Sequence, residues 1–188
     1  MNEHVFTDRD FPDHLRCQYM SFLRTHWWWL FQGEQRLRTT MWPVDIEPTH
    51  VVLEESGILI SYATIVNKMV GHTDTSFRTA AISAVFTYPA WRKQGYGQHL
   101  MNLVTERIRT NDYDIAMLFC ESEIMELYHK SGWLAMQSPT LSGDPANPSS
   151  SADDEYPETR MMLFLSEHGQ AHQAAFDHTP VYVGKHSW

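Results

Sequence analysis

The sequence predicts a mixed α/β fold in which a central sheet is flanked by helices. Runs of β-branched and aromatic residues alternate with runs whose apolar residues have helical spacing, from about residue 49 to residue 137. The chain has 188 residues, of which 43% are hydrophobic. This length and composition suit one domain with a sizeable core, so we expect a single domain over residues 1–188.

The N-terminal part of the chain, residues 11–37, has the pattern of helical structure rich in aromatic side chains. At its centre, residues 27–31 are WWWLF. Such a cluster is typical of core packing, with the alternative that part of it lines the site of a small molecule. Residues 51–54 and 58–66 follow as predicted strands, joined by a hairpin turn at Ser56 and Gly57.

A glycine-containing turn lies between a predicted strand and a predicted helix. Residues 80–88 are small, aromatic or β-branched, and Pro89 ends this strand. The helix begins near Gly97, and its apolar residues Leu100, Met101, Val104 and Ile108 share one face. N–H groups at a helix N-terminus bind anions, and glycines let phosphate oxygens approach them. Gly95 and Gly97, with the cations Arg92 and Lys93, therefore predict either a simple turn or a pyrophosphate cradle for a CoA-type nucleotide.

A second segment contains a buried strand and a short helix. Residues 113–120 are predicted to form the strand, and Ser122 is a candidate N-cap for a helix that runs to Lys130. Gly132 follows in the position of a left-handed C-cap. Tyr128 shares the apolar face of this helix, so it is either a core tyrosine or a catalytic residue.

Two motifs in this order resemble those of the GNAT acetyltransferase superfamily. Residues 92–97, RKQGYG, match the signature Arg/Gln-x-x-Gly-x-Gly/Ala, and residues 127–133, LYHKSGW, are similar to the second motif with its tyrosine. The resemblance implies a mixed α/β fold whose central strands splay apart, with acetyl-CoA as the acetyl donor.

The resemblance also implies roles for individual residues. The backbone of Val85 and Thr87 would pair with the pantetheine arm of CoA, and Tyr128 would donate a proton to the CoA thiolate. A phenol with a pKa of about 10 is protonated at neutral pH and can supply that proton. The residues implied at the pyrophosphate are Gln94, Gly95, Tyr96 and Gly97, with Arg92 as a neighbouring cation.

A narrower resemblance is to the aminoglycoside 2'-N-acetyltransferase branch. It rests on residues 50–66, the Tyr128 segment, the acidic residues 153–155 and the terminal Trp188. The acceptor site that it implies includes Ser83, Asp153, Asp154 and Trp188. At Ser83 that branch has a glutamate that positions water at the acceptor amine, and a serine cannot replace it as a carboxylate base.

The charge of the chain favours a cationic small molecule over nucleic acid as the partner. Lys and Arg number 14 against 23 Asp and Glu, which gives a net charge of −9. Nucleic-acid binding needs a basic surface, whereas an acidic surface attracts cations or simply maintains solubility. The sequence has no apolar run of membrane-spanning length and an N-terminus unlike a signal peptide, so we expect a cytoplasmic protein without a membrane partner.

Cys17 and Cys120 lack the paired spacing of metal ligands. His168 and His172 are the only histidine pair at clear helical spacing, and no carboxylate or third histidine completes a metal site near them, so we expect no metal cofactor. Cys17 and Cys120 are expected to be reduced residues without a catalytic role. Residues 142–157 are rich in Pro, Ser, Gly and acidic residues and are expected to form a mobile acidic loop. This loop is either unconstrained or a flap over the acceptor.

The reaction that these motifs imply is direct acetyl transfer in a ternary complex. The acceptor amine must lose a proton, so a base or a water chain is required. Glu121 and Glu123 are candidates because they follow the strand that would line the cleft, and the Trp188 carboxylate is another.

Three functions follow from these observations. The first is an N-acetyltransferase for a small cationic amine such as an aminoglycoside. The second is an acetyltransferase for a polyamine, an amino acid or a peptide amine, and the third is a non-catalytic module that binds acyl-CoA or an antibiotic. Because GNAT relatives are often dimers, the resemblance also suggests a homodimer.

Overall fold

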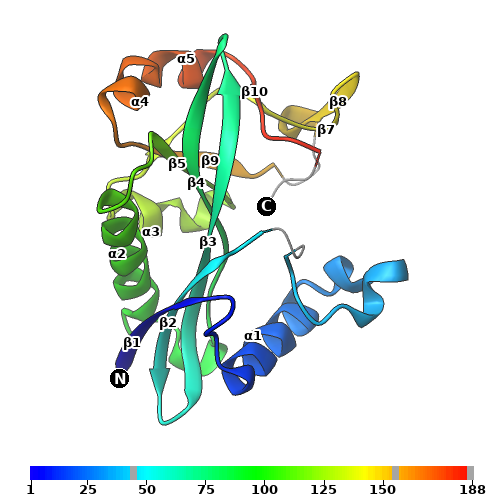
Figure 1. Ribbon diagram of the computed structural model, residues 1–188, viewed down its shortest axis with the longest axis vertical. Helices are drawn as coiled ribbons and strands as arrows, with labels where there is room; N and C mark the ends of the chain where they lie inside the picture. Colours follow the sequence, from blue (N-terminus) through cyan, green and yellow to red (C-terminus); the bar gives the residue numbers. More distant parts are fainter. Residues whose placement is uncertain (43–45, 154–156, 186–188) are drawn as a thin grey trace. The chain divides into compact units, whose positions relative to one another are not determined.

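The structure is a computed structural model that describes residues 1–42, 46–153 and 157–185 (Figure 1). The chain contains both strands and helices, with parallel and antiparallel pairs in its main sheet, and the predicted mixed α/β fold is confirmed. The chain divides into two compact units, Met1–Val66 with Ala84–Val104 and Asn67–Ser83 with Thr105–Trp188. The expectation of one domain stays a prediction.

The first unit contains the N-terminal strands of the sheet. Strands β1 (Asn2–Thr7), β2 (Thr49–Glu55) and the first part of β3 (Ile58–His72) form an antiparallel ladder. The last residues of β4 (Thr75–Thr87) and most of helix α2 (Tyr96–Arg109) also belong to this unit. Ser56 and Gly57 form the predicted hairpin turn with φ angles of 53° and 78°, which suit a two-residue hairpin loop.

An aromatic core joins helix α1 (Asp13–His26) to this part of the sheet. Phe22 of α1 stacks on Phe86 of β4 with ring centroids 3.8 Å apart, and Tyr19 stacks on Tyr62 of β3 at 4.8 Å. The buried side chains of this core are Phe11, Leu15, Tyr19, Met20, Phe22, Leu23, Phe31, Val52, Leu59, Tyr62 and Phe86. Large rings bury much apolar surface, so this cluster is a main source of the unit's stability.

The segment that follows α1 differs in part from its prediction. Two short 3-10 helices, η1 (Trp28–Phe31) and η2 (Gly33–Leu37), replace a longer helical run. Phe31 is buried in the aromatic core, but Trp28 and Trp29 are 59% and 55% exposed. The prediction of core packing is therefore wrong for these two tryptophans. Consecutive helical residues point in different directions around the axis, so they cannot all face one core.

The second unit is built on the remaining parts of β3 and β4. Strand β5 (Ile115–Cys120) lies within the predicted buried strand and pairs antiparallel with β9 (Thr159–Phe164), which also pairs with the short β6 (Leu134–Ala135). β4 pairs in parallel with β5 only from Thr79 to Ala81, although both strands continue. The ladder thus ends early, as the splayed central strands of the resemblance require. The hydrogen-bonded order of the whole sheet is β1-β2-β3-β4-β5-β9-β6.

A second sheet occupies much of the segment expected to be a loop, residues 142–157. Strand β7 (Thr140–Asp144) pairs antiparallel with β8 (Asn147–Ser150) and parallel with β10 (Val181–Tyr182), and a 3-10 helix η5 (Ser151–Asp153) follows β8. The prediction of irregular structure is wrong for these strands, because the β7–β8 hairpin and the pairing of β7 with the distant β10 stabilise a composition that is unfavourable for strands. The mobility of the segment stays a prediction.

Two short helices, α4 (Glu167–Ala171) and α5 (Gln173–His178), complete the core of the second unit. Phe176 of α5 is fully buried and packs edge-on against Phe77 with ring centroids 5.0 Å apart. Ser166 caps α4 by accepting a hydrogen bond from the Gly169 N–H at 3.0 Å. Within the described ranges, no helix is long and apolar enough to cross a membrane.

Candidate cofactor cradle and acetyl-transfer site

The end of β4 carries a backbone irregularity just before Val85. Ala84 has a φ angle of 52°, which side-chain-bearing residues rarely adopt and which costs about 1–3 kcal/mol. Beyond it, the strand is fixed to β3: Tyr88 N–H donates to Ile60 O at 3.0 Å, and Ser61 Oγ donates to Phe86 O at 2.8 Å. Val85 and Thr87, predicted at the pantetheine arm, therefore lie on a strand end that is firmly held.

The turn after β4 contains two residues in the left-handed region. A 3-10 helix η3 (Pro89–Trp91) comes first, and then Lys93 and Gly95 have φ angles of 61° and 87°. Apart from Gly95 itself and its two chain neighbours, no heavy atom of the described chain lies within 4 Å of the position that a Gly95 Cβ would take. The glycine thus leaves open space at the start of α2, as a backbone cradle for a ligand requires.

The first turn of α2 presents N–H groups at the same corner. Gly95 O accepts from His99 N–H at 3.0 Å, and N–H groups that precede the first such donor have no acceptor within a helix. Arg92 and Lys93 are exposed beside them. Arg92 Nε donates to Thr87 O at 3.0 Å, which holds its guanidinium over the turn. Partial positive charge from the helix and two cations make this turn complementary to a phosphate or pyrophosphate.

The structure brings the predicted pyrophosphate residues together in this one turn. Arg92, Gln94, Gly95, Tyr96 and Gly97 follow one another around the helix N-terminus. The Gln94 side chain donates back to Ala90 O at 3.1 Å, and the Tyr96 ring lies edge-on to Trp91 at 6.1 Å. The role of each residue toward a cofactor stays a prediction.

Tyr128 lies in the second unit, on helix α3 (Met125–His129), and only 3% of its surface is exposed. Burial raises the pKa of its phenol, and the neighbouring Cys120 and Glu158 raise it further. Tyr128 is therefore protonated at neutral pH, as a proton donor must be. Burial and the acidic Glu158 and Glu121 also raise the pKa of Cys120 to about 12, so its thiol is not a ready nucleophile.

The helix that carries Tyr128 begins later than predicted. Residues Ser122–Ile124 form the 3-10 helix η4, and α3 starts only at Met125, without a side-chain cap from Ser122. The predicted C-cap is confirmed: Gly132 has a φ angle of 87°, and Trp133 N–H donates to Tyr128 O at 3.2 Å.

The remaining predicted site residues are distributed over the second unit. Glu121 and Glu123 are exposed at η4, Ser83 is half-buried in β4, and Asp153 is exposed in η5. Asp154 and Trp188 lie outside the described residues. Their roles as base or as acceptor residues stay predictions.

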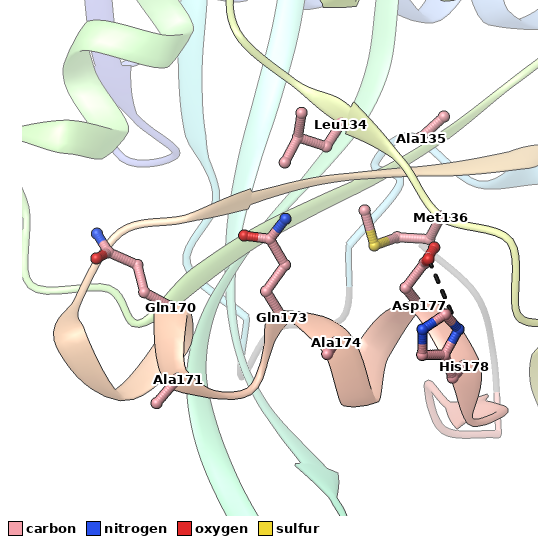
Figure 2. Close-up of a pocket in the computed structure, with 9 residues that line it drawn as sticks. All are labelled: Leu134, Ala135, Met136, Gln170, Ala171, Gln173, Ala174, Asp177 and His178. Atoms are coloured by element: carbon pink, nitrogen blue, oxygen red, sulfur yellow. Dashed lines mark ion pairs between the residues drawn. The ribbon is translucent and has the colours of Figure 1, made fainter.

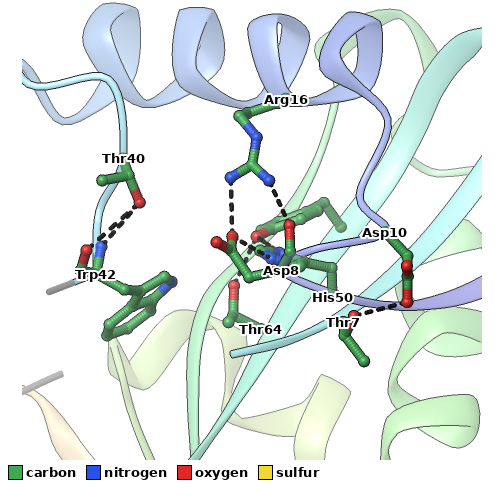
Figure 3. A network of polar contacts seen from close by, with 9 residues as sticks. Thr7, Asp8, Asp10, Arg16, Thr40, Trp42, His50 and Thr64 are labelled. Carbon is green, nitrogen blue, oxygen red and sulfur yellow. Dashed lines mark hydrogen bonds and ion pairs between the residues drawn. The ribbon is translucent and has the colours of Figure 1, made fainter. Parts of the chain in front are cut away.

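A chain of polar groups in the first unit has no counterpart in the sequence prediction (Figure 3). Thr64 Oγ1 donates to Tyr62 Oη at 2.8 Å, Tyr62 Oη lies 2.6 Å from His50 Nδ1, and His50 Nε2 lies 3.2 Å from Asp8 Oδ1. Burial lowers the pKa of His50 to about 4, although Asp8 opposes this shift. Burial works to raise the pKa of Asp8, but hydrogen bonds from Arg16 and His50 outweigh it and lower the pKa. The residues lie apart in the sequence, so only the register of the strands reveals the chain.

The second unit has a groove between a short strand and two short helices (Figure 2). It has a volume of about 510 Å³ and is lined by β6 and by helices α4 and α5, with Leu134, Met136 and Gln173 among its residues. Asp177 and His178 form an ion pair of 3.8 Å at its edge. Its lining includes none of the residues predicted for cofactor or acceptor.

The fold defines the class, an α/β protein in which a glycine-containing turn leads from β4 into the N-terminus of α2. The chain belongs to the acetyltransferase (GNAT) domain family, whose sequence profile matches residues 6–136. The family prediction is confirmed.

Known proteins agree with this assignment. The chain is 27% identical over 114 residues to an aminoglycoside 2'-N-acetyltransferase from Mycolicibacterium fortuitum, a match that covers 61% of the chain and spans 58% of that relative's length. Its fold is similar to that of an aminoglycoside 6'-N-acetyltransferase complexed with coenzyme A, with a TM-score of 0.61, 15% identity and coverage of 88% and 98% of the two chains. Escherichia coli ElaA gives a TM-score of 0.60 at 14% identity, with coverage of 86% and 99%.

Proposed function

We propose that this protein is an N-acetyltransferase that moves the acetyl group of acetyl-CoA to a primary amine of a small cationic acceptor, with an aminoglycoside as the first candidate. The observation that carries the proposal is the turn before α2. Left-handed Lys93 and Gly95, the open space at Gly95 and the exposed Arg92 all suit an anionic nucleotide. Membership in the GNAT family supports acetyl-CoA as that nucleotide.

Acetyl-CoA supplies an activated thioester, and the residues of the first unit hold and polarise it. The backbone of Val85 and Thr87 would bind the pantetheine arm, while Gln94 to Gly97 and Arg92 would bind the pyrophosphate. The left-handed φ of Ala84 interrupts the extended strand just ahead of Val85. This favours the Val85 N–H as a donor to the thioester oxygen, where negative charge develops in the transition state.

Tyr128 is the proposed general acid. When the C–S bond breaks, the departing thiolate needs a proton, and the raised pKa of Tyr128 keeps that proton on the phenol until then. The acceptor nitrogen attacks the carbonyl carbon directly, so no acyl-enzyme forms, in agreement with the raised pKa of Cys120.

The proposed acceptor is supported by the net charge of the chain and by the acceptors of related proteins. A net charge of −9 attracts a cationic amine, and relatives by sequence and by fold include aminoglycoside acetyltransferases. Asp153, Asp154, Trp188 and Ser83 are the proposed acceptor residues, and Glu121 or Glu123 the proposed base. Because Ser83 is no carboxylate, a polyamine, an amino acid or a peptide amine is the second candidate acceptor.

The first experiment measures thiol release from acetyl-CoA against a panel of aminoglycosides, polyamines, amino acids and short peptides. Turnover confined to aminoglycosides supports the first candidate, and turnover confined to another amine replaces it. Binding of CoA without turnover on any amine supports a non-catalytic module instead.

Two variants then test the assigned residues. Tyr128→Phe should lower kcat by about 10² because the general acid is lost, and an unchanged kcat would contradict that role. Gly97→Trp should abolish CoA binding in calorimetry because the ring fills the cradle. Glu106→Trp, an exposed position on the same helix, is the control and should bind CoA normally.

A further inference from the structure

A second cavity in the second unit lies beside the start of strand β9. Its volume is about 380 Å³, which is enough for a small molecule. The described residues that line it are Met125, residues 135–140, Ser151 and residues 157–160. Among these residues, only Glu158 and Arg160 carry a charge at neutral pH.

The two charged side chains of this cavity have different surroundings. Arg160 is buried, and its guanidinium makes four hydrogen bonds to oxygen atoms of residues 138–140 and Phe176. Glu158, two residues earlier, is exposed. The charge of Arg160 is thus directed to protein acceptors, whereas Glu158 offers a carboxylate to a cationic molecule that enters the cavity.

The same carboxylate lies near the proposed general acid. β9 begins at Thr159, which pairs with Cys120 at the end of β5, and Glu158 immediately precedes this pair. Burial is the main cause of the raised pKa of Tyr128 and of Cys120, and the negative charge of Glu158 raises both pKa values further. Met125, which also lines the cavity, lies one helical turn before Tyr128 on α3. The cavity therefore borders the helix that carries the proposed acid.

The cavity also adjoins the segment proposed to bind the acceptor. Ser151 lines it and begins η5, which ends at the proposed acceptor residue Asp153. Glu121 and Glu123, the carboxylates considered as bases so far, are exposed at η4 but do not line this cavity. Glu158 combines a place in the cavity with an electrostatic effect on Tyr128.

We propose that the acceptor amine enters this cavity and that Glu158, in place of Glu121 or Glu123, is the general base of acetyl transfer. The inference rests on the proposed function and assigns the deprotonation that Ser83 cannot perform as a carboxylate. Glu158 would contact the acceptor nitrogen itself, so it is a catalytic residue and not a positioning residue.

The proton transfers balance over one turnover. The acceptor ammonium gives one proton to the Glu158 carboxylate, and the freed lone pair of its nitrogen forms the N–C bond with the thioester carbonyl. The electrons of the C–S bond leave with sulfur, and Tyr128 gives its phenolic proton to the thiolate. The new amide nitrogen loses its second proton through water to the Tyr128 phenolate. Glu158 releases its proton to solvent.

The proximity of base and acid couples the two proton transfers. While Glu158 is ionised, its charge favours the protonated form of Tyr128. When Glu158 takes the ammonium proton this charge is neutralised, and the pKa of Tyr128 falls. The phenol therefore becomes a stronger acid at the stage at which the amine becomes a nucleophile.

The test replaces Glu158 by an amide of the same size. Glu158→Gln removes the base, and its control is Glu126→Gln, an exposed carboxylate next to Met125 that forms an ion pair with Lys130 at 3.3 Å. Glu121→Gln and Glu123→Gln examine the two competing bases in the same assay. The measured quantities are kcat and KM for the best acceptor of the panel, CoA affinity and thermal stability.

Glu158→Gln should lower kcat by about 10² at neutral pH and leave KM within about twofold, because the base acts in the chemical step. The control should match the wild type. The loss should shrink by about tenfold per pH unit toward the pKa of the amine, because an amine that arrives deprotonated needs no base. At pH values up to about 8.5, Tyr128 and Cys120 stay protonated and Arg160 stays charged. The pH dependence in this range therefore reports the acceptor amine.

Each outcome decides the proposal. A loss of kcat that shrinks with rising pH supports Glu158 as the base, since a structural defect would not be relieved in this way. An increase in KM alone overturns the base role, because Glu158 would then only bind a cation. A loss of equal size at every pH, or a kcat equal to that of the control, also overturns it and leaves the transferase function intact. A wild type that acetylates no amine overturns the proposed function, and the role of Glu158 with it.

Discussion

The two units provide different kinds of hydrogen-bond partners for their buried polar side chains. In the first, His50 is neutral, and its hydrogen bonds run through hydroxyl groups to a carboxylate at the surface. In the second, Arg160 is 2% exposed and donates to Ser138 Oγ, Pro139 O, Thr140 Oγ1 and Phe176 O. Hydroxyls and an imidazole can exchange roles as donor and acceptor, whereas a guanidinium only donates. The first arrangement suits proton transfer and the second suits rigidity.

Arg160 is charged despite its surroundings. Burial lowers its pKa to about 10, and Asp177 acts in the opposite direction. Among the described residues, no carboxylate lies within ion-pair distance of its guanidinium. The carbonyl of Phe176, near the end of α5, takes part of the charge instead.

The largest effect is expected when this buried cation is removed. Arg160→Met should destabilise the protein by about 3–5 kcal/mol, because buried carbonyl groups lose their donors. Urea unfolding followed by fluorescence measures the change. Lys130→Met, at a side chain that is 60% exposed, is the control and should change stability by less than about 0.5 kcal/mol. Equal stability of the two variants would show that Arg160 is not a structural anchor.

A smaller loss of stability is expected at acidic pH. One buried histidine in each unit contributes to it, so the loss can be assigned to the two units separately. The pKa of His50 is lowered from its usual 6.5 to about 4, so the folded protein binds fewer protons than the unfolded chain between these values. The contribution of neutral His50 to the free energy of unfolding is fully present above pH 6.5. It is lost as pH falls toward 4, and the loss is about 3 kcal/mol in total. Burial also lowers the pKa of His72 in the second unit, with a contribution of the same sign.

The unfolding free energy of the wild type, His50→Gln and His72→Gln at several pH values between 7 and 4 separates the two histidines. His50→Gln should lower stability at pH 7 but flatten its decline with acid. His72→Gln should reduce the decline of stability with acid by the part that His72 contributes. A decline that His50→Gln leaves unchanged would mean that His50 is already protonated in the folded protein.

The features that could be predicted from the sequence are those fixed by neighbouring residues. Gly95 and Gly132 are left-handed where glycine was required, and the apolar spacing of Leu100, Met101 and Val104 located α2. Local chemistry decides these structures, because turn and cap geometry depend on a few consecutive residues. The buried side of α2 and the core strand β5 were predictable for the same reason.

The features that could not be predicted depend on pairing between distant residues. Strand β7 forms because Thr140 and Leu141 pair with Val181 and Tyr182, and no local pattern shows this. The polar chain likewise requires His50 and Thr64 to be opposite each other in the β2–β3 ladder. The hydrogen-bond partners of Arg160 come from two separate segments, residues 138–140 and Phe176, so its burial could not be predicted either.

The smallest of the expected effects compares a glycine from each unit. A Cβ on Gly169 of α4 would lie 2.2 Å from Asp114 O, and that oxygen is held by hydrogen bonds from Leu165 N–H at 2.9 Å and Ser166 N–H at 3.3 Å. Because backbone cannot rotate away as a side chain can, Gly169→Ala should cost about 2–3 kcal/mol by displacing α4. Gly33 in the first unit has a φ of 54°, and apart from its two chain neighbours no heavy atom of the described chain lies within 4 Å of its Cβ position. Gly33→Ala should therefore cost only the backbone strain of about 1–2 kcal/mol. Urea unfolding of both variants checks the order. A Gly33→Ala variant less stable than Gly169→Ala would mean that α4 shifts freely on β5 and that the second unit is the less rigid of the two.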